Sequence, residues 1–275
     1  MSEKKIHPTA VVSPEAEIAD DVTIGPFVVI EPDVVIGEGC FIESHTVIKR
    51  FTVLGKRNKI AEHVVLGGLP KDANFKGERS YLRIGDDNIL REHVTIYRAI
   101  GEEQKTEIGS RNFMMVGVHI SHNCNVGDDN VFVNGATLAE YVTAEDHIFF
   151  SQNTAGHQFV RFGRYAMIGG KSKIEQDVLP FSMTDGNPPL VHGLNVVGLR
   201  RAGFTSEERL NLKRAFGVLL RSGLSPEEAI YEVEKIEDEN VAHLLNFIRN
   251  SKPGFVGAQA GRTSDEQTEQ EDVRI

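Results

Sequence analysis

Two histidines and a cysteine lie close together in the segment VGVHISHNCNVG, residues 116–127. His119 and His122 are three residues apart, and Cys124 follows two residues later. These residue types fit three interpretations: a metal site, a general base with neighbouring polar groups, or ordinary surface. The choice depends on the direction of each side chain, and therefore on the fold that positions it.

Composition limits the functions that the chain can have. The chain has 275 residues and a formal net charge of −10, which argues against a general nucleic-acid-binding protein. It contains no N-terminal signal-like segment and no apolar run long enough to cross a bilayer, so we expect a soluble, cytoplasmic protein without membrane insertion. Its two cysteines, Cys40 and Cys124, fit a reducing compartment and form no disulfide framework.

Aliphatic residues recur at every sixth position, as in Ile6, Val12, Ile18, Ile24, Ile30, Ile36, Ile42 and Ile48. The rhythm resumes after two interruptions and ends at Ile168 and Ile174. A small or β-branched residue stands four positions after each of these eight aliphatics, from Ala10 to Thr52, and a glycine often follows the aliphatic directly, as in IGPFVV and IGEGCF. A period of six matches neither an α-helix, with 3.6 residues per turn, nor a plain strand, with a period of two.

A six-residue period is typical of a chain that makes a short strand, turns a corner and repeats around a triangular prism. The aliphatic and the small residue then both point inward, and stacked coils bury a continuous column. We expect glycine at the corner because it tolerates backbone conformations that other residues resist. The sequence therefore predicts an all-β parallel β-helix of hexapeptide repeats from about residue 6 to 186.

Two polar stretches, residues 68–83 and 98–107, interrupt the period. We expect them to be loops that project from the prism. Loops on a rigid scaffold often carry binding and catalytic residues, although such loops can also be passive.

The period changes after residue 189, where helical spacing begins. Two helix starts are marked by capping signals, Thr205 with Glu208 and then Ser225 with Pro226 and Glu228. The segment NVAHLLNFIRN predicts a third helix. We therefore divide the chain into a β-helix domain, residues 1–190, a C-terminal helical domain, residues 191–257, and a polar tail, residues 258–275, that we expect to be disordered.

The hexapeptide phase orients the opening segment. Ile120 and Cys124 fall on inward positions, whereas His119 lies between inward residues and His122 falls at a corner. This phase argues against a core role for either histidine and assigns one to Cys124. A zinc site needs three converging nitrogen or sulfur donors. Gamma-class carbonic anhydrases, a related β-helix family, space their histidine pair five residues apart, and here the spacing is three. We therefore expect no metal and no other cofactor.

Several segments together resemble the UDP-N-acetylglucosamine O-acyltransferase family: HPTAVV, KDANFKGE, HISHNC, NGATLAEYV, AGHQFVRFG and DGNPPLVHGLNVVGLRRAGF. Many acetyltransferases share the hexapeptide rhythm, whereas the last segment joined to three helices is specific. The resemblance covers almost the whole chain. It implies a left-handed β-helix, a homotrimer, and transfer of a 3-hydroxyacyl chain from acyl carrier protein to the 3-position of UDP-N-acetylglucosamine, the first step of lipid A biosynthesis.

The resemblance also implies roles for individual residues. His122 would be the general base that takes the proton of the sugar 3-hydroxyl. The backbone N–H of Glu140 would stabilise the thioester oxyanion. Binding of the acceptor or of the acyl chain is implied for Asp72, Asn74, His119, His157, Gln158, Gly170, Asn195 and Arg201. Among these, Asn195 and Arg201 would hold the nucleotide end, and Gly170 would limit the depth of the acyl chain.

The chain departs from the family pattern at several of these positions. Asn123 stands where the family has aspartate, and Glu140 and Tyr141 stand for glycine and histidine. A family lysine, glutamate and arginine are replaced by Asn74, Val197 and Ala202. Asparagine can fix an imidazole tautomer but cannot neutralise an imidazolium, and the carboxylate of Glu140 would oppose an oxyanion. A related UDP-amino sugar with a 3-amino acceptor group therefore stays open.

Two further alternatives also stay open at this stage. One is a hexapeptide acyltransferase that uses acetyl-CoA, and the other is a non-catalytic β-helix scaffold. An acidic carrier protein would need a local basic surface, and the sequence offers one cluster for it: Arg161, Arg164, Lys171, Lys173, Arg200 and Arg201. A solvated charged face is the alternative explanation for this cluster.

Overall fold

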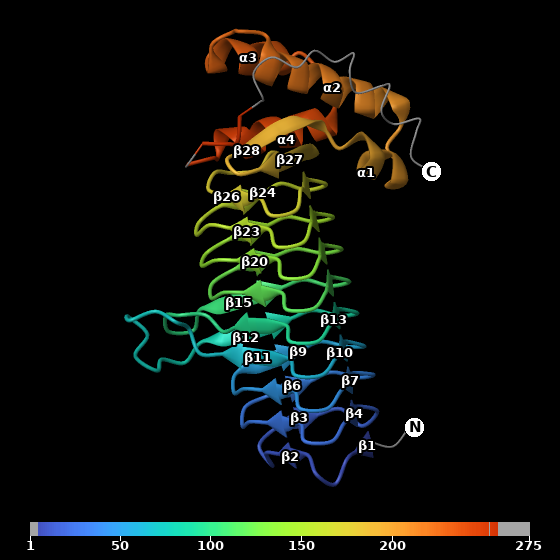
Figure 1. Ribbon diagram of the computed structural model, residues 1–275, viewed down its shortest axis with the longest axis vertical. Helices are drawn as coiled ribbons and strands as arrows, with labels where there is room; N and C mark the ends of the chain where they lie inside the picture. Colours follow the sequence, from blue (N-terminus) through green and yellow to red (C-terminus); the bar gives the residue numbers. More distant parts are fainter. Residues whose placement is uncertain (1–4, 253, 258–275) are drawn as a thin grey trace.

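Each hexapeptide repeat forms one short strand and one corner, and three repeats complete a coil (Figure 1). The computed structural model describes residues 5–252 and 254–257. Strands of consecutive coils pair in parallel, with partners such as Thr23 and Phe41 eighteen residues apart. The predicted parallel β-helix is confirmed over this part of the chain, and the tail predicted to be disordered, residues 258–275, lies outside the described residues.

Three sheets form the faces of the prism. Sheet A contains β1 (Lys5–Ile6), β4 (Thr23–Ile24), β7 (Phe41–Ile42), β10 (Lys59–Ile60), β13 (Ile89–Leu90), β16 (Phe113–Met114), β19 (Val131–Phe132), β22 (Phe149–Phe150), β25 (Met167–Ile168), β27 (Ser182–Gly186) and β28 (Pro189–Leu194). Sheet B contains β2 (Val11–Val12), β5 (Val29–Ile30), β8 (Val47–Ile48), β11 (Val65–Gly68), β14 (Thr95–Tyr97), β17 (His119–Ile120), β20 (Thr137–Leu138), β23 (Ala155–Gly156) and β26 (Lys173–Ile174). Sheet C contains β3 (Glu17–Ile18), β6 (Val35–Ile36), β9 (Thr52–Leu54), β12 (Tyr81–Ile84), β15 (Lys105–Ile108), β18 (Asn125–Val126), β21 (Thr143–Ala144) and β24 (Arg161–Phe162).

The sixth-residue aliphatics form the core of the prism, as predicted. Ile24, Ile42 and Ile120 are among them, and each is at most 1% exposed. Ile6 is 40% exposed, because it belongs to the first coil and has a neighbouring coil on one side only. Burial of these columns removes apolar surface from water along the whole axis, which is the main stabilising contribution in a fold of this kind.

Glycine is required after the aliphatic residue for a different reason from the one expected. Gly109 does not adopt a left-handed backbone; the left-handed residue of that corner is Arg111, with φ +59°. A Cβ at Gly109 would overlap Asp128 Oδ1 of the next coil and lie 2.6 Å from the carbonyl oxygen of Gly127. Close approach of the next coil, and not backbone freedom, therefore requires glycine here.

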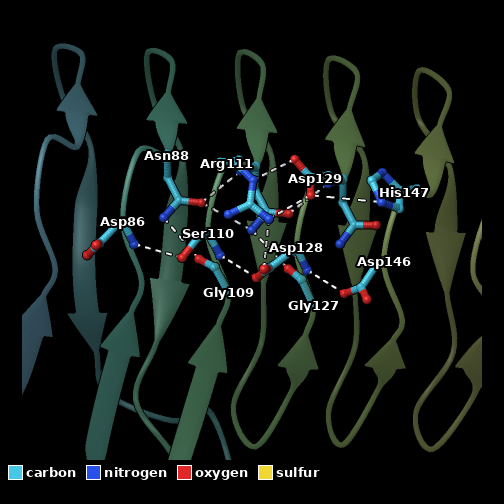
Figure 2. A network of polar contacts seen from close by, with 12 residues as sticks. Asp86, Asn88, Gly109, Ser110, Arg111, Gly127, Asp128, Asp129, Asp146 and His147 are labelled. Carbon is cyan, nitrogen blue, oxygen red and sulfur yellow. Dashed lines mark hydrogen bonds and ion pairs between the residues drawn. The ribbon is translucent and has the colours of Figure 1, made fainter. Parts of the chain in front are cut away.

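A buried asparagine column replaces the small or β-branched residue in four consecutive coils: Asn58, Asn88, Asn112 and Asn130. The amides bond to one another and to the backbone along the axis, and Figure 2 labels Asn88 of this column. Asn112 Nδ2 donates to the carbonyl oxygen of Gly127 at 3.0 Å, and Asn112 Oδ1 accepts from the backbone N–H of Asn130 at 2.9 Å. These bonds offset the cost of burying the amides, except at Asn130, whose Nδ2 has no partner among the described residues. Asparagine therefore takes the inward position that small or β-branched residues hold in the earlier coils.

Both predicted loops are confirmed and project from the same side of the prism (Figure 1). Residues 69–80 connect β11 to β12, and residues 98–104 connect β14 to β15. Glu78 in the first loop accepts a hydrogen bond from the backbone N–H of Gly101 in the second, at 2.9 Å. The two loops therefore support one another beside the prism.

Four helices cover the last coils: α1 (Val196–Arg201), α2 (Ser206–Arg221), α3 (Pro226–Val233) and α4 (Glu239–Arg249). The capping boxes predicted for α2 and α3 are both present. No sequence pattern predicted α1, a single short helix that Asn195 caps. Strand β28 extends across residue 190, and the division of the chain at that point stays a proposal. None of the described helices is long and apolar enough to cross a membrane.

Contacts from α4 correct the interpretation of two arginines as free surface cations. The guanidinium of Arg161 lies 4.1 Å above the Phe247 ring, and its Nη1 donates to the carbonyl oxygen of Phe247 at 3.2 Å. Arg164 Nη2 donates to Asn240 Oδ1 at 2.9 Å. Because both side chains are engaged by α4, they fasten the helical domain to the prism and contribute little free surface for docking.

Candidate active site

Three of the predicted site residues form a column at the corner between sheets B and C. His122, Glu140 and Gln158 follow one another at intervals of eighteen residues, so they occupy the same turn position in successive coils. Backbone bonds fix the stacking, since Tyr141 N–H donates to the His122 carbonyl oxygen at 3.2 Å and Phe159 N–H donates to that of Glu140 at 3.0 Å. Neighbouring members are therefore separated by about one strand spacing, ~4.8 Å.

Asn123 connects His122 to the second loop. Its Oδ1 accepts from the backbone N–H of Ile100 at 2.9 Å, and its Nδ2 donates to the Ile100 carbonyl oxygen at 3.1 Å. These two backbone groups define which end of the amide is oxygen. Oδ1 also lies 2.9 Å from His122 Nδ1, so Nδ1 must carry a proton and donate it. The neutral imidazole then has its lone pair on Nε2.

The side chain of His122 is only 1% exposed, which corrects the expectation of an open, outward-facing residue. It does lie at a corner and outside the inner apolar column, as predicted. The edge of its ring meets Tyr141, with centroids 5.5 Å apart. Nε2 has no hydrogen-bond partner among the described residues. It is not fully buried, so a small part of its surface contacts solvent. A reacting hydroxyl would therefore have to meet the ring at this nitrogen.

His119 lies in β17, the strand that leads into the corner of His122, and its side chain is on the outer side of sheet B. Thr95 Oγ1 is 2.7 Å from its Nδ1, and the edge of its ring meets the Tyr97 ring at 4.8 Å between centroids. Burial, followed by the positive charge of Lys71, lowers the pKa of His119, although Glu140 opposes this shift. His119 is therefore a neutral hydrogen-bonding group at neutral pH.

Glu140 offers two different groups to the corner. Its backbone N–H has no acceptor among the described residues, so the group is available to an oxyanion. Its carboxylate is half-buried and accepts a hydrogen bond from Ser121 Oγ at 3.1 Å. Burial raises the pKa of the Tyr141 phenol, and the carboxylates of Asp72 and Glu140 raise it further, which places Asp72 within electrostatic reach of this corner.

The other predicted residues divide into those on the first loop or on coils above His122 and those that one chain does not bring to His122. His157 and Gln158 are exposed on coils above His122, and Asp72 and Asn74 lie in the first loop, where Asp72 Oδ1 accepts from the Asn74 backbone N–H at 2.7 Å. The other three are not brought to His122 within one chain: Gly170 lies at the corner between sheets A and B, and Asn195 and Arg201 lie at the two ends of α1. Asn195 is already engaged, since it caps α1 and donates to the Tyr165 carbonyl oxygen at 2.9 Å.

Cys124 is buried, as predicted, and donates to the Ala139 carbonyl oxygen at 3.0 Å. Burial raises the pKa of its thiol to about 12, so it provides neither a thiolate nucleophile nor a metal ligand at neutral pH. Within residues 5–252 and 254–257, no three histidine, cysteine, aspartate or glutamate side chains converge as a metal site.

Sequence reasoning missed two contributors to the site. Lys71 Nζ lies 5.4 Å from the centre of the Tyr97 ring and brings a positive charge close to His119. Tyr141 and Phe159 stack at 5.0 Å with an interplanar angle of 14°, forming an aromatic surface beside the column. Two sequence features could have indicated these contributors. Lys71 directly precedes Asp72, and Tyr141 and Phe159 are eighteen residues apart.

Comparison with known proteins places these features in a family. The family model described as UDP-N-acetylglucosamine O-acyltransferase, domain 2, matches residues 177–256, and the bacterial transferase hexapeptide model matches residues 15–50 and 33–68. The chain is 44% identical over 255 residues to the acyl-carrier-protein-dependent UDP-N-acetylglucosamine O-acyltransferase of Alkalilimnicola ehrlichii, covering 92% of this chain and 99% of the relative. The corresponding enzyme of Thiobacillus denitrificans is also 44% identical, over 91% of this chain and 98% of its own.

Solved structures agree with the sequence relatives. The structure of LpxA from Acinetobacter baumannii superposes with a TM-score of 0.88 at 38% identity, covering 91% of this chain and 99% of that one. UDP-N-acetylglucosamine acyltransferase from Bacteroides fragilis superposes with a TM-score of 0.89 at 35% identity and the same coverage. The predicted left-handed form of the β-helix is confirmed by this likeness.

Replacing Asn123 with aspartate tests the connection between His122 and the loop. An aspartate oxygen would face the Ile100 carbonyl oxygen, to which Nδ2 now donates at 3.1 Å, so a hydrogen bond becomes a repulsion. We expect a loss of about 1–3 kcal/mol of stability and faster amide hydrogen exchange in residues 98–104. Asn125→Asp is the matched control, because Asn125 is exposed and its side chain has no hydrogen bond among the described residues. Equal exchange in both variants would contradict the assignment.

Proposed function

Because the chain belongs to the UDP-N-acetylglucosamine O-acyltransferase family, and is therefore an acyltransferase, we propose that His122 is the general base of its reaction. The enzyme transfers an acyl chain from acyl carrier protein to UDP-N-acetylglucosamine, the first step of lipid A biosynthesis. The observation that carries the proposal is the Asn123 amide, whose orientation leaves the lone pair of His122 on Nε2. In this proposal the transferred chain is a 3-hydroxyacyl group, the acceptor is the 3-hydroxyl, and the enzyme works in the cytoplasm.

The proposed reaction needs one proton acceptor and one oxyanion donor. His122 Nε2 removes the proton of the sugar 3-hydroxyl while that oxygen bonds to the thioester carbonyl carbon. The carbonyl oxygen becomes an oxyanion beside the backbone N–H of Glu140. When the tetrahedral intermediate collapses, the carbon–sulfur bond breaks and the imidazolium returns its proton to the departing sulfur. An imidazole suits both transfers because it can accept a proton and return it at neutral pH.

The acceptor lies along the corner column in this proposal. The sugar faces His122, with Asp72, Asn74, His119, His157 and Gln158 around it. The nucleotide extends toward the helical domain, where Arg201 holds it and Asn195 contributes by capping α1, the helix that carries Arg201. Arg201 is exposed and forms no ion pair among the described residues, so its guanidinium is available to the diphosphate.

We propose that the enzyme is a homotrimer, as the resemblance implies. An apolar column on the outer face of sheet A supports this: Ile89, Phe113, Val131, Phe149, Met167 and Met183. Phe149 is 39% exposed in one chain, and such a face is normally covered by a partner. The position of Gly170 on a different corner from His122 agrees, since a neighbouring copy can bring it to the site while its own chain cannot.

Acyl carrier protein is an acidic donor, so we propose that it docks on the exposed cations near the helical domain. Lys171 is exposed and has no ion pair among the described residues, whereas Lys173 pairs with Glu175 at 2.6 Å. Arg200, Lys213 and Arg214 are also exposed, whereas Arg161 and Arg164 are committed to α4. The docking surface is therefore smaller than the sequence indicated.

Substituting His122 tests the base. We expect His122→Ala and the shape-preserving His122→Asn to lower turnover with acyl carrier protein and UDP-N-acetylglucosamine by about a hundredfold or more. Circular dichroism and sedimentation serve as folding controls, and sedimentation is expected to return three chains per particle for both variants. Near-normal turnover in the folded variants would exclude His122 as the base.

A second pair of variants separates the charge of Asp72 from its turn. Asp72→Asn keeps an oxygen for the Asn74 N–H and removes only the charge, whereas Asp72→Ala removes both. Titration calorimetry with UDP-N-acetylglucosamine is expected to give about tenfold weaker binding for the alanine variant, an intermediate loss for the asparagine variant, and unchanged melting temperatures for both. Wild-type affinity in Asp72→Asn would assign Asp72 to the turn alone.

Charge reversal tests the docking surface. We expect Lys171→Glu combined with Lys173→Glu to lower kcat/KM for acyl carrier protein donors while sparing affinity for the UDP-sugar. The defect is expected to shrink as salt rises, because charges are screened over ~10 Å at 0.1 M. Lys105→Glu is the control, since Lys105 pairs with Glu107 at 2.6 Å much as Lys173 pairs with Glu175, but on a lower coil. A salt-independent defect, or none, would remove these lysines from the docking surface.

A further inference from the structure

Ser121 and Glu140 form a polar pair that spans two coils at the corner of the site. Ser121 is 4% exposed, and its hydroxyl donates to one carboxylate oxygen of Glu140 at 3.1 Å. The other oxygen, Oε2, has no hydrogen-bond partner among the described residues. It is not fully buried, so it contacts solvent. No lysine, arginine or histidine nitrogen of the described chain lies within ion-pair distance of this carboxylate. The pair thus holds a carboxylate in place with one oxygen free.

The position of this oxygen relates it to the reacting hydroxyl. Glu140 follows His122 in the corner column, so the carboxylate belongs to the coil about 4.8 Å beyond the base. The charge of Glu140 raises the pKa of both His119 and Tyr141, so the carboxylate lies within electrostatic reach of both groups. A sugar whose hydroxyl meets His122 Nε2 therefore places a neighbouring ring substituent beside Glu140.

The chemistry of the free oxygen defines what it can bind. An ionised carboxylate accepts hydrogen bonds and donates none, so it suits an O–H or N–H donor and repels phosphate. The carbons adjacent to the acylated one carry two such donors in UDP-N-acetylglucosamine: the acetamido N–H on one side and the 4-hydroxyl on the other. Neither donor takes part in the acyl transfer itself.

Building on the proposed function, we propose that the Ser121-held carboxylate of Glu140 is a specificity-determining group that accepts a hydrogen bond from the donor flanking the acylated position of the sugar. The carboxylate selects the acceptor, while the backbone N–H of the same residue serves the oxyanion. Ser121 keeps the charged oxygens directed at the sugar and away from the thioester. Glu140 therefore does not oppose the reaction as its charge alone would suggest.

The test compares acceptors that differ at one flanking carbon. Glu140→Ala, Glu140→Gln and the Ser121→Ala, Glu140→Ala double variant are assayed with one acyl carrier protein donor and three acceptors: UDP-N-acetylglucosamine, its 4-epimer UDP-N-acetylgalactosamine, and UDP-2-deoxyglucose, which has no donor at carbon 2. A hydrogen bond to a charged group is worth about tenfold or more in kcat/KM. We expect the preference over the 4-epimer to fall by that factor if the 4-hydroxyl is the donor, and the preference over UDP-2-deoxyglucose to fall if the acetamido group is.

Controls separate this role from a structural one. The double variant leaves no buried hydroxyl unpaired, so we expect a near wild-type melting temperature together with the same loss of preference. Glu43→Gln, a half-buried carboxylate on a lower coil without a hydrogen-bond partner among the described residues, is expected to change neither preference. Unchanged preferences in Glu140→Ala, or an equal loss of turnover with all three acceptors, would overturn the inference. Failure of the proposed function itself is a different result, namely no turnover of UDP-N-acetylglucosamine by the wild-type enzyme.

Discussion

The spacing between coils, about 4.8 Å, is the constraint on which the rest of this structure depends. Each corner must accept the corresponding corner of the next coil directly above it, eighteen residues later except where the two loops lengthen a coil. Glycine follows many aliphatics because a Cβ at a position such as Gly109 would overlap the next coil. Asn88 and Asn112 are accommodated in the core because the side chain of each bonds to the coils on both sides. The same spacing places His122, Glu140 and Gln158 in one line, so the column of proposed site residues is a direct product of the repeat.

Catalytic function depends on what the loops add to this regular stack. Asn123 occupies an ordinary left-handed corner position, with φ +58°, but its amide connects the prism to the loop at Ile100 and fixes the His122 tautomer. An aspartate could orient the imidazole and also balance its charge, whereas asparagine supplies orientation alone. In this chain the negative charge of the corner lies one coil further, at Glu140, where Ser121 controls its direction.

The parts of the fold that repeat were predictable, and the parts that depend on single long-range contacts were not. The six-residue period predicted the prism, its loops and the inward direction of Ile120 and Cys124, and the capping signals predicted α2 and α3. No pattern indicated that Arg161 would be engaged by Phe247, eighty-six positions along the chain. The burial of His122 was missed for the same reason, since it arises from Tyr141 and from neighbours outside its own repeat. Family resemblance supplied candidate residues, but their contacts depend on geometry that belongs to this chain.

The central claim is that Asn123 holds His122 in the one tautomer that leaves Nε2 free to act as base. Neutron diffraction from deuterium-exchanged crystals at neutral pH would locate the ring proton directly. The account predicts a deuteron on Nδ1 of His122, directed at Asn123 Oδ1, and none on Nε2. A deuteron on Nε2 with a bare Nδ1 would contradict it, because the imidazole would then present a donor, and no base, to the acceptor hydroxyl.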